Sequence, residues 1–231
     1  MRVLVSVRDV AEARLVAAAG VDFIDLKEPS RGALGGLDVP AIVAIVRLLH
    51  GSGARVSATI GDLPVDAVEP ILGRVEAVAA TGVDLVKVGL PGRGGPAAMR
   101  LLDRLRASGH ALVPVLLADQ GLAPAFVDAV AARGFAGMMA DTARKGAGSL
   151  FAMIAEAEIA HLVAAARKAG CLVGLAGALR HDELPRLRAA SPDFAGFRSA
   201  VCHGDRTGTL DPDRLAALVR ALHVVPSAVA V

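Results

Sequence analysis

A single (β/α)8 barrel is the fold that this sequence predicts, on three observations. Eight short apolar runs alternate with segments of helical period along 231 residues, a length that suits one barrel domain spanning residues 1–231. The runs are unbroken series of Val, Leu and Ile, which is typical of parallel strands covered by helices. Several helical segments end at a glycine just before the next strand, where a left-handed cap is expected; these glycines are Gly20, Gly82, Gly109, Gly134 and Gly170. An open, doubly wound sheet is the alternative fold.

The strands are predicted from the apolar runs, in chain order. They are expected at Val3–Val7, Phe23–Lys27, Arg55–Ile60, Leu85–Leu90, Ala111–Leu117, Gly137–Asp141, Leu172–Leu175 and Gly196–Arg198. Each run has the length of an ordinary buried strand, and side chains along it alternate between the two faces.

The helices are predicted from the amphipathic segments between these strands. They are expected at Ala11–Ala19, Val39–Leu49, Ala67–Ala80, Ala97–Ala107, Ala125–Ala132, Glu156–Lys168, Asp182–Ala189 and Pro212–Leu222. The apolar tail Val224–Val231 is too short to span a membrane. It would dock on the barrel or on a neighbouring subunit, which leaves a homo-oligomer open.

The composition limits the classes of partner. A net charge of +2 and the lack of Trp and Tyr argue against nucleic acid as a partner, and no uncharged run reaches the ~18 residues of a membrane span. Met1–Val5 runs straight into a strand and does not resemble a signal peptide, so we expect a cytoplasmic protein. Cys171 and Cys202 have no Cys-x-x-Cys or His pairing, and the histidines show no metal or triad spacing. No metal site is therefore predicted, and the thiols are expected to be reduced.

The end of the second strand, Asp25-Leu26-Lys27-Glu28-Pro29, is the most informative stretch for function. Alternation puts Phe23, Asp25 and Lys27 on one face, so a carboxylate and an amine lie side by side where the strand ends. Lysine is rare, because only four of the 25 basic residues are Lys. Arginine cannot lose its proton near neutral pH or condense with a carbonyl, so a retained lysine indicates that the amine itself is needed.

Three of the four lysines are predicted to reach one end of the barrel. Lys27 ends the second strand, Lys87 lies within the fourth, and Lys145 follows Asp141 in a Gly-rich loop. Active-site groups of this fold lie at the carboxyl ends of strands and in the loops after them. Lys168, in the last turn of a helix, has an ordinary solvent position.

Clustered lysines with nearby carboxylates favour imine chemistry. An amine that is partly desolvated and crowded by other cations is more often the free nucleophile at pH 7. Two structural alternatives stay open: a buried Lys–Asp pair that stabilises the barrel, and lysines that bind phosphate as point charges. Asp25 and Asp141 would orient the amines, shuttle protons or bind a metal, and the metal ranks last because no histidine lies beside them.

Two further sets of residues are candidates for substrate binding. Ser57 and Thr59 share one face of the third strand, where they either hydrogen-bond a polyhydroxy substrate or fill a tight barrel layer. The loops after the last two strands are the usual phosphate site of this fold, although they could also be helix entries without a ligand. The candidates in these loops are Gly177, Arg198, Ser199 and Ala200, and the polar loop 204–208 lies beside them.

Taken together, these motifs resemble the (5-formylfuran-3-yl)methyl phosphate synthase family, collinearly over nearly the whole chain. The stretches that carry the resemblance are Asp25–Pro29 with Gly32–Gly35, Val56–Asp62, Val86–Leu90, Asp141-Thr142 with Lys145, and Arg198–Arg206. The resemblance implies a barrel lyase without a cofactor that joins two molecules of glyceraldehyde 3-phosphate into a phosphorylated furan aldehyde, a precursor of methanofuran-type one-carbon carriers. It further implies that Lys27 forms the Schiff base and Lys87 abstracts a proton, assisted by Asp25, Asp141 and Lys145.

The sequence departs from the family pattern at Gly146, Ala178 and Ser199, where Asp, Ser and Gly are expected. These positions affect loop geometry and phosphate binding and leave the lysines unchanged. Three other functions remain as alternatives: a Schiff-base aldolase on another sugar phosphate, a decarboxylase-like barrel whose Asp-x-Lys acts electrostatically, and a non-catalytic sugar-phosphate binder.

Overall fold

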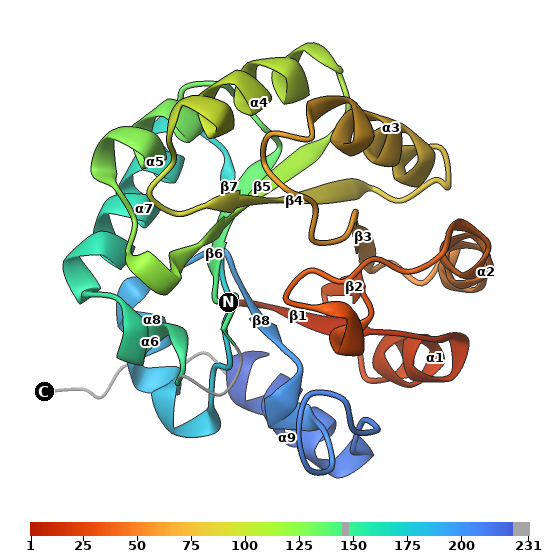
Figure 1. Cartoon of the computed structure of the whole chain (residues 1–231). Helices are drawn as coiled ribbons and strands as arrows, with labels where there is room; N and C mark the ends of the chain where they lie inside the picture. The colour runs from red at the N-terminus through yellow and green to blue at the C-terminus, as the bar shows by residue number, and fades with distance from the viewer. Residues whose placement is uncertain (145–147, 224–231) are drawn as a thin grey trace, which may run out of the picture.

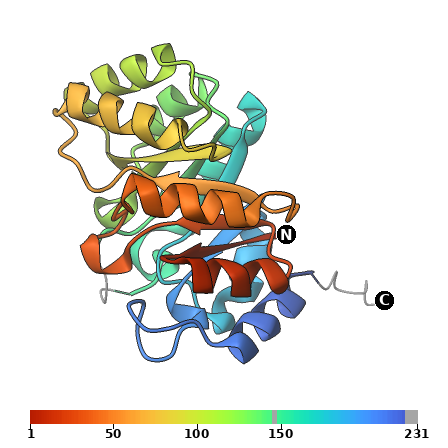
Figure 2. The same ribbon diagram turned by 90° about the vertical axis from the view of Figure 1, so that its right-hand side faces the viewer.

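The computed structural model describes residues 1–144 and 148–223, and within these residues eight parallel strands close into a barrel. The strands follow chain order around the barrel, and β1 completes the ring by pairing with both β2 and β8. Helices surround the strands on the outside (Figures 1 and 2). The predicted (β/α)8 barrel is therefore confirmed, and the open sheet is excluded.

The strands have the following bounds: β1 Arg2–Val7, β2 Phe23–Leu26, β3 Arg55–Thr59, β4 Leu85–Pro91, β5 Leu112–Leu117, β6 Gly137–Asp141, β7 Leu172–Leu175 and β8 Phe194–Phe197. The α-helices are α1 Val10–Ala18, α2 Val39–Leu49, α3 Val68–Ala79, α4 Pro96–Ala107, α5 Pro124–Ala131, α6 Leu150–Met153, α7 Glu156–Ala169, α8 Leu184–Ala190 and α9 Pro212–His223. Short 3-10 helices are η1 Pro29–Arg31, η2 Ala118–Gln120, η3 His181–Glu183 and η4 Ser199–Val201.

Most of the predicted elements agree with the structure to within one residue at each end, but two differ more clearly. The eighth strand begins two residues earlier than expected, because Phe194 pairs with Arg2 and Ala195 pairs with Leu175; it also ends one residue before Arg198. Residues 181–183 form the 3-10 helix η3 rather than the start of α8. The predicted glycine caps are correct in conformation, since all five glycines have φ between 63° and 89°.

The core has two layers, as expected for a filled barrel. A large cluster of Val, Leu and Ile side chains packs between the strands and the helices. A smaller cluster fills the barrel interior, with Leu4, Phe23, Leu85, Val115 and Phe194 among its members. Ala33 and Leu34 join this inner cluster although they come from the loop after β2. That loop therefore packs into the mouth of the barrel.

Three aspartates tie the bottom of the barrel together. Each directly precedes an even-numbered strand and accepts a hydrogen bond from a backbone N–H of the preceding odd-numbered strand. The pairs are Asp22 with Val3 (2.7 Å), Asp84 with Val56 (2.7 Å) and Asp193 with Val173 (2.8 Å). These carboxylates satisfy strand-end donors on the face opposite the mouth, where residues contribute to stability rather than to chemistry.

Two expectations from the sequence concern membrane-spanning segments and the cysteine thiols. Within residues 1–144 and 148–223, none of the helices combines the length and the hydropathy that crossing a bilayer would need. The structure pairs neither cysteine in a disulfide; Cys202 is buried and Cys171 is partly exposed. Burial raises the pKa of both thiols.

Candidate active site

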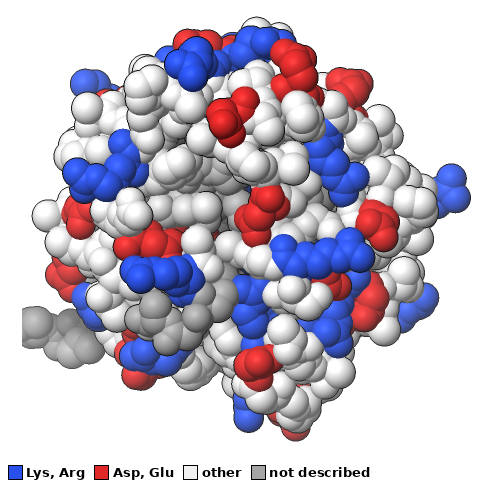
Figure 3. Space-filling view, viewed as in Figure 1, with Lys and Arg blue, Asp and Glu red and all other residues white. Residues whose placement is uncertain are grey.

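The carboxyl ends of the strands open onto a cavity of about 710 Å³, here called the mouth cavity. Residues of β1, β4, β6 and β8 and of the loops after β2, β7 and β8 line it. Its lining residues include Ser6, Lys27, Lys87, Met139, Asp141, Gly177, Arg198, Ser199 and Arg206. Figure 3 shows this face of the molecule, on which acidic and basic side chains lie around a hollowed centre.

Lys27 extends into the mouth cavity from the end of β2. Its backbone N–H continues the strand ladder by donating to the carbonyl of Val7 at 3.0 Å. Its Nζ donates to the carbonyl oxygen of Ala33 at 3.2 Å and lies 3.9 Å from Oδ2 of Asp141, the last residue of β6. The side chain is 10% exposed. The amine of Lys27 is therefore held at the cavity wall with limited access to water.

Lys87 lies deeper, on β4, and forms a close ion pair. Its Nζ is 2.9 Å from Oδ1 of Asp25, and each side chain is 3% exposed. Asp25 also accepts hydrogen bonds from Ser57 Oγ at 2.6 Å and from Ser6 Oγ at 3.2 Å. Burial acts to raise the pKa of Asp25, but Lys87, Lys27 and Ser57 outweigh it and hold that pKa below its ordinary value. Asp25 is thus a fixed carboxylate that orients Lys87.

The two lysines differ in how they are held. Lys87 is bound to a carboxylate at hydrogen-bond distance, whereas Lys27 donates to a neutral carbonyl and has its nearest carboxylate 3.9 Å away. Lys27 is therefore better placed to leave its protein partner and attack a carbonyl carbon. Lys87 is better placed to exchange protons, because a fixed acceptor holds it.

The hydroxyls of β3 are directed at the protein. Ser57 donates to Asp25, and Thr59 Oγ1 lies 3.0 Å from the carbonyl of Gly35 and 3.4 Å from that of Leu26. Both side chains are fully buried, and neither residue lines the mouth cavity. In this arrangement Ser57 supports the Lys87–Asp25 pair, and Thr59 holds the loop that follows β2.

The loop after β7 approaches the end of β6 very closely. Gly177 has φ of 109°, and a Cβ there would lie 2.9 Å from Cγ2 of Thr142. Ala178 has a φ of 46°, a left-handed conformation that non-glycine residues rarely adopt and that tends to occur at functional sites. Gly177, Ala178 and Ser199 line the mouth cavity, whereas Ala200 does not. Lys145 and Gly146 lie outside the described residues.

The guanidinium of Arg198 is held by contacts within the protein. Its guanidinium pairs with Glu12 of α1 through both Nη atoms, at 2.5 and 3.0 Å. The other contacts run from Nη1 to the carbonyl of Ser6, from Nε to that of Arg206 and from Nη2 to that of Gly208. Burial acts to lower the pKa of Arg198, but Glu12 reverses this and raises it. All five N–H donors of Arg198 are directed at protein oxygens, so the side chain joins α1 to the loop after β8.

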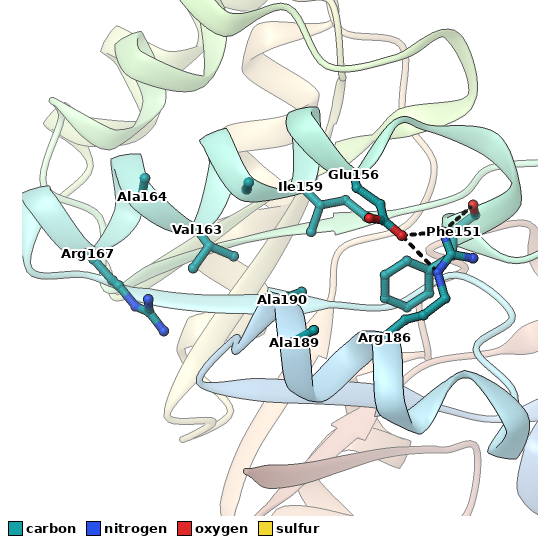
Figure 4. Close-up of a pocket in the computed structure, with 10 residues that line it drawn as sticks. Phe151, Glu156, Ile159, Val163, Ala164, Arg167, Arg186, Ala189 and Ala190 are labelled. Atoms are coloured by element: carbon teal, nitrogen blue, oxygen red, sulfur yellow. Dashed lines mark hydrogen bonds and ion pairs between the residues drawn. The ribbon is translucent and has the colours of Figure 1, made fainter.

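Two other depressions lie apart from the lysines. A second cavity of about 760 Å³ lies at the ends of β3, β4 and β5 and includes Gly32, Ala33, Asp62, Arg93 and Asp119 among its lining residues. An outer groove runs between α7 and α8, lined by Ile159, Val163 and small alanines, with Arg186 packed over the ring of Phe151 at one end (Figure 4). Neither depression contains Lys27 or Lys87. Among the described residues, no three or more His, Cys, Asp or Glu side chains form a group that could hold a metal ion.

Arg206 and Glu12 are the residues that the sequence analysis missed as parts of the site. Arg206 lies in the polar loop noted beside the predicted phosphate loops and ends the stretch Arg198–Arg206 that carries the family resemblance, but neither signal assigned it a role. Glu12 lies on α1 and pairs with a residue 186 positions away, so no local pattern indicates it.

Comparisons with known proteins show the family to which this chain belongs. A sequence model of the family described as 4-HFC-P synthase matches residues 3–219. A relative from Methylorubrum extorquens is 37% identical over 228 residues, covering 98% of this chain and 94% of its own. The (5-formylfuran-3-yl)methyl phosphate synthases of Archaeoglobus fulgidus and Methanopyrus kandleri are each 34% identical, over 96% and 89% of this chain and 100% and 91% of their own.

Solved structures show the same fold at lower identity. The phosphoribosyl anthranilate isomerase of Thermus thermophilus matches with a TM-score of 0.66 and 20% identity, over 96% of this chain and 98% of its own. A 3-hexulose-6-phosphate synthase matches with a TM-score of 0.58 and 21% identity, over 94% of this chain and 99% of its own. These likenesses concern the barrel architecture alone.

Proposed function

Because this chain belongs to the 4-HFC-P synthase family, we propose that it condenses two molecules of glyceraldehyde 3-phosphate into (5-formylfuran-3-yl)methyl phosphate. The reaction loses one phosphate and water, and its product would serve the synthesis of methanofuran-type one-carbon carriers. The observation that carries the proposal is that Lys27 and Lys87 line one cavity and that each amine lies near a carboxylate, Lys27 near Asp141 and Lys87 near Asp25.

The first step forms an imine on Lys27. The Nζ of Lys27 leaves the carbonyl of Ala33 and attacks the aldehyde carbon of one triose phosphate, giving a carbinolamine. Lys87 then donates a proton to the departing hydroxyl, which leaves as water, and the C=N bond forms. Asp141, 3.9 Å from Lys27, balances the positive charge of the iminium.

The second step uses the amine that Lys87 has just released from its proton. The iminium acidifies the neighbouring C–H, and the neutral Lys87 removes that proton, so the electron pair becomes the C=C bond of an enamine. Asp25 holds Lys87 in position in both protonation states, supported by Ser57 and Ser6. The enamine either expels its phosphate or attacks the second aldehyde; dehydration and ring closure give the furan. Lys145 assists these proton transfers.

The phosphates would lie near the loops after β7 and β8. Gly177, Arg198 and Ser199 line the mouth cavity there, and Ser199 and Ala200 are the first residues of η4, whose leading N–H groups have no partner within the helix. Because imine formation, proton transfer and elimination change no overall oxidation state, the scheme requires no redox cofactor.

Borohydride trapping with glyceraldehyde 3-phosphate tests the proposal. We expect peptide mass mapping to find the reduced adduct on Lys27, and Lys27→Arg to lose both the adduct and the furan absorbance. Lys168→Arg, on the exposed end of α7, is the matched control and should keep both. Because the chain has no Trp or Tyr, the ultraviolet background of the protein is low.

Each other outcome points to one alternative. An adduct without a furan product would favour an aldolase for another sugar phosphate. Furan formation without an adduct would favour electrostatic catalysis by the Asp-x-Lys pair. The absence of both would favour a non-catalytic binder and would contradict the proposal.

A further inference from the structure

Arg206, in the loop between β8 and α9, reaches across the mouth cavity. Its guanidinium donates through Nη2 to the carbonyl oxygens of Pro29 and Gly32, in the loop after β2. The side chain lines the mouth cavity together with Lys27 and is partly buried. A cation is thus placed beside the proposed nucleophile by a loop distant from it in the sequence.

The charge of Arg206 is the least neutralised among the described cations of this cavity. Lys87 is paired with Asp25, Arg198 with Glu12, and Lys27 lies near Asp141. Within the described chain, by contrast, no carboxylate oxygen lies within 4.0 Å of the Arg206 guanidinium. Its hydrogen-bond partners are neutral carbonyls, and Asp141, Asp62 and Asp205 attract it only from farther away. An anion entering the cavity would find this charge available.

The backbone that carries Arg206 is firmly held. Arg198 Nε donates to the carbonyl of Arg206 at 2.9 Å, and its Nη2 donates to that of Gly208 at 2.8 Å. Arg8 Nη1 donates to the carbonyl of Thr207 at 2.6 Å, and the N–H of Thr207 donates to Asp205 at 2.7 Å. Arg198 and Arg8 therefore hold the backbone carbonyls of the polar loop, and this fixes the position from which the Arg206 side chain extends.

The distance to Lys27 suits a triose phosphate. Lys27 donates to the carbonyl of Ala33, and Arg206 donates to the carbonyl of the preceding residue, Gly32. Consecutive Cα atoms are about 3.8 Å apart, so the two cationic groups lie within roughly 10 Å of each other. The aldehyde carbon and the phosphate of one triose phosphate span a similar distance when hydrogen bonds at the phosphate end are included.

We propose that Arg206 binds the phosphate of the triose held on Lys27, with Arg198 as the residue that positions it; this inference rests on the proposed function. Arg206 Nε and Nη1 meet no hydrogen-bond acceptor among the described residues, so each has an N–H group left to donate to a phosphate oxygen. Nη2 meanwhile keeps the loop after β2 closed over the imine. Arg206 is then a specificity-determining residue that selects phosphorylated aldehydes.

Inorganic phosphate tests the binding site without relying on turnover. Phosphate should raise the melting temperature of the wild-type protein, and Arg206→Gln, which keeps a donor for the loop carbonyls but removes the charge, should abolish that rise. Arg93→Ala, at the second cavity, is the matched control and should keep it. An equal rise in wild type and Arg206→Gln, or no rise in either, would overturn the inference.

The trapping reaction then separates this inference from the proposed function. Arg206→Gln should trap glyceraldehyde 3-phosphate about 10- to 100-fold less efficiently than wild type but trap unphosphorylated glyceraldehyde equally well, because only a phosphate contact is lost. Arg206→Lys should recover part of the difference. Equal losses with both aldehydes would overturn the phosphate role of Arg206 while leaving imine chemistry intact. If the wild type forms no adduct or furan, the proposed function fails, and the melting-temperature comparison still decides whether Arg206 binds phosphate.

Discussion

The amine of Lys87 and the carboxylate of Asp25 lie 2.9 Å apart inside the barrel, where both side chains are almost completely buried. Ser57 and Ser6 complete the hydrogen bonds of the carboxylate from the two neighbouring strands, β3 and β1. The same pair is thus an element of the barrel interior and the base of the mouth cavity. Its structural and chemical roles can be separated by substitution.

Asp25→Asn should be strongly destabilising, because it leaves the ammonium group of Lys87 buried without its counter-charge. We expect the free energy of unfolding to fall by about 3 kcal/mol or more, and furan formation to fall by about 100-fold. Urea denaturation and initial rates measure the two effects. The double variant Asp25→Asn/Lys87→Met should recover much of the stability but none of the activity, and a single variant as stable as wild type would contradict this account.

Asp25 should also stabilise the fold only in a defined pH range. Burial acts to raise its pKa, but Lys87, Lys27 and the hydrogen bond from Ser57 hold it below its ordinary value of 3.8. A carboxyl whose pKa is lower in the folded than in the unfolded chain stabilises fully above the unfolded pKa and loses this contribution as the pH falls through the folded pKa. The stabilisation should therefore be complete above about pH 4 and decline below it.

Unfolding free energies measured from pH 7 down to pH 3 test this range. The wild type should lose stability more steeply below pH 4 than Asp25→Asn/Lys87→Met, which lacks the titrating pair. Parallel curves for the two proteins would mean that Asp25 contributes nothing to the acid sensitivity of the fold.

A site residue could be predicted from the sequence wherever a single strand determines where its side chain lies. The alternation of β2 placed Asp25 and Lys27 on the inward face, and the rule for parallel barrels placed both at the mouth. The apolar runs also fixed the order of the barrel, since each strand pairs with the next along the chain.

Interactions between distant segments could not be predicted. Glu12 pairs with Arg198 across 186 residues, and Arg206 reaches carbonyls of a loop more than 170 residues earlier, without any shared periodicity. The hydroxyl of Thr59 faced inward as expected, yet its partners are backbone carbonyls whose position depends on the loop after β2. The helix α6 has four residues, too few to give a helical period.

Asp193 should contribute to stability without affecting catalysis, because it lies at the bottom of the barrel and accepts the N–H of Val173 at 2.8 Å. Asp193→Ala should lower the free energy of unfolding by about 1 kcal/mol, and Asp193→Asn, which keeps an acceptor, should recover part of this. Asp66→Ala, on an exposed loop, is the control and should change nothing. A changed KM for glyceraldehyde 3-phosphate in Asp193→Ala would contradict this prediction, because it would mean that a change at the bottom of the barrel affects the mouth cavity.

Gly177→Ala should change the shape of the mouth cavity, because Gly177 forms part of its wall. The residue has φ of 109°, and a Cβ there would come within 2.9 Å of Thr142 at the end of β6. We expect a loss of roughly 1–3 kcal/mol in stability and a raised KM, since the loop that carries the predicted phosphate contacts must move. Gly134→Ala is the matched control, because its φ is also positive, at 63°, but a Cβ there would meet no atom within 4 Å. Kinetics and urea denaturation should show a loss of stability in both variants, larger in Gly177→Ala because its Cβ also meets Thr142, and a raised KM in Gly177→Ala alone. An unchanged KM in both would remove the loop after β7 from the phosphate site.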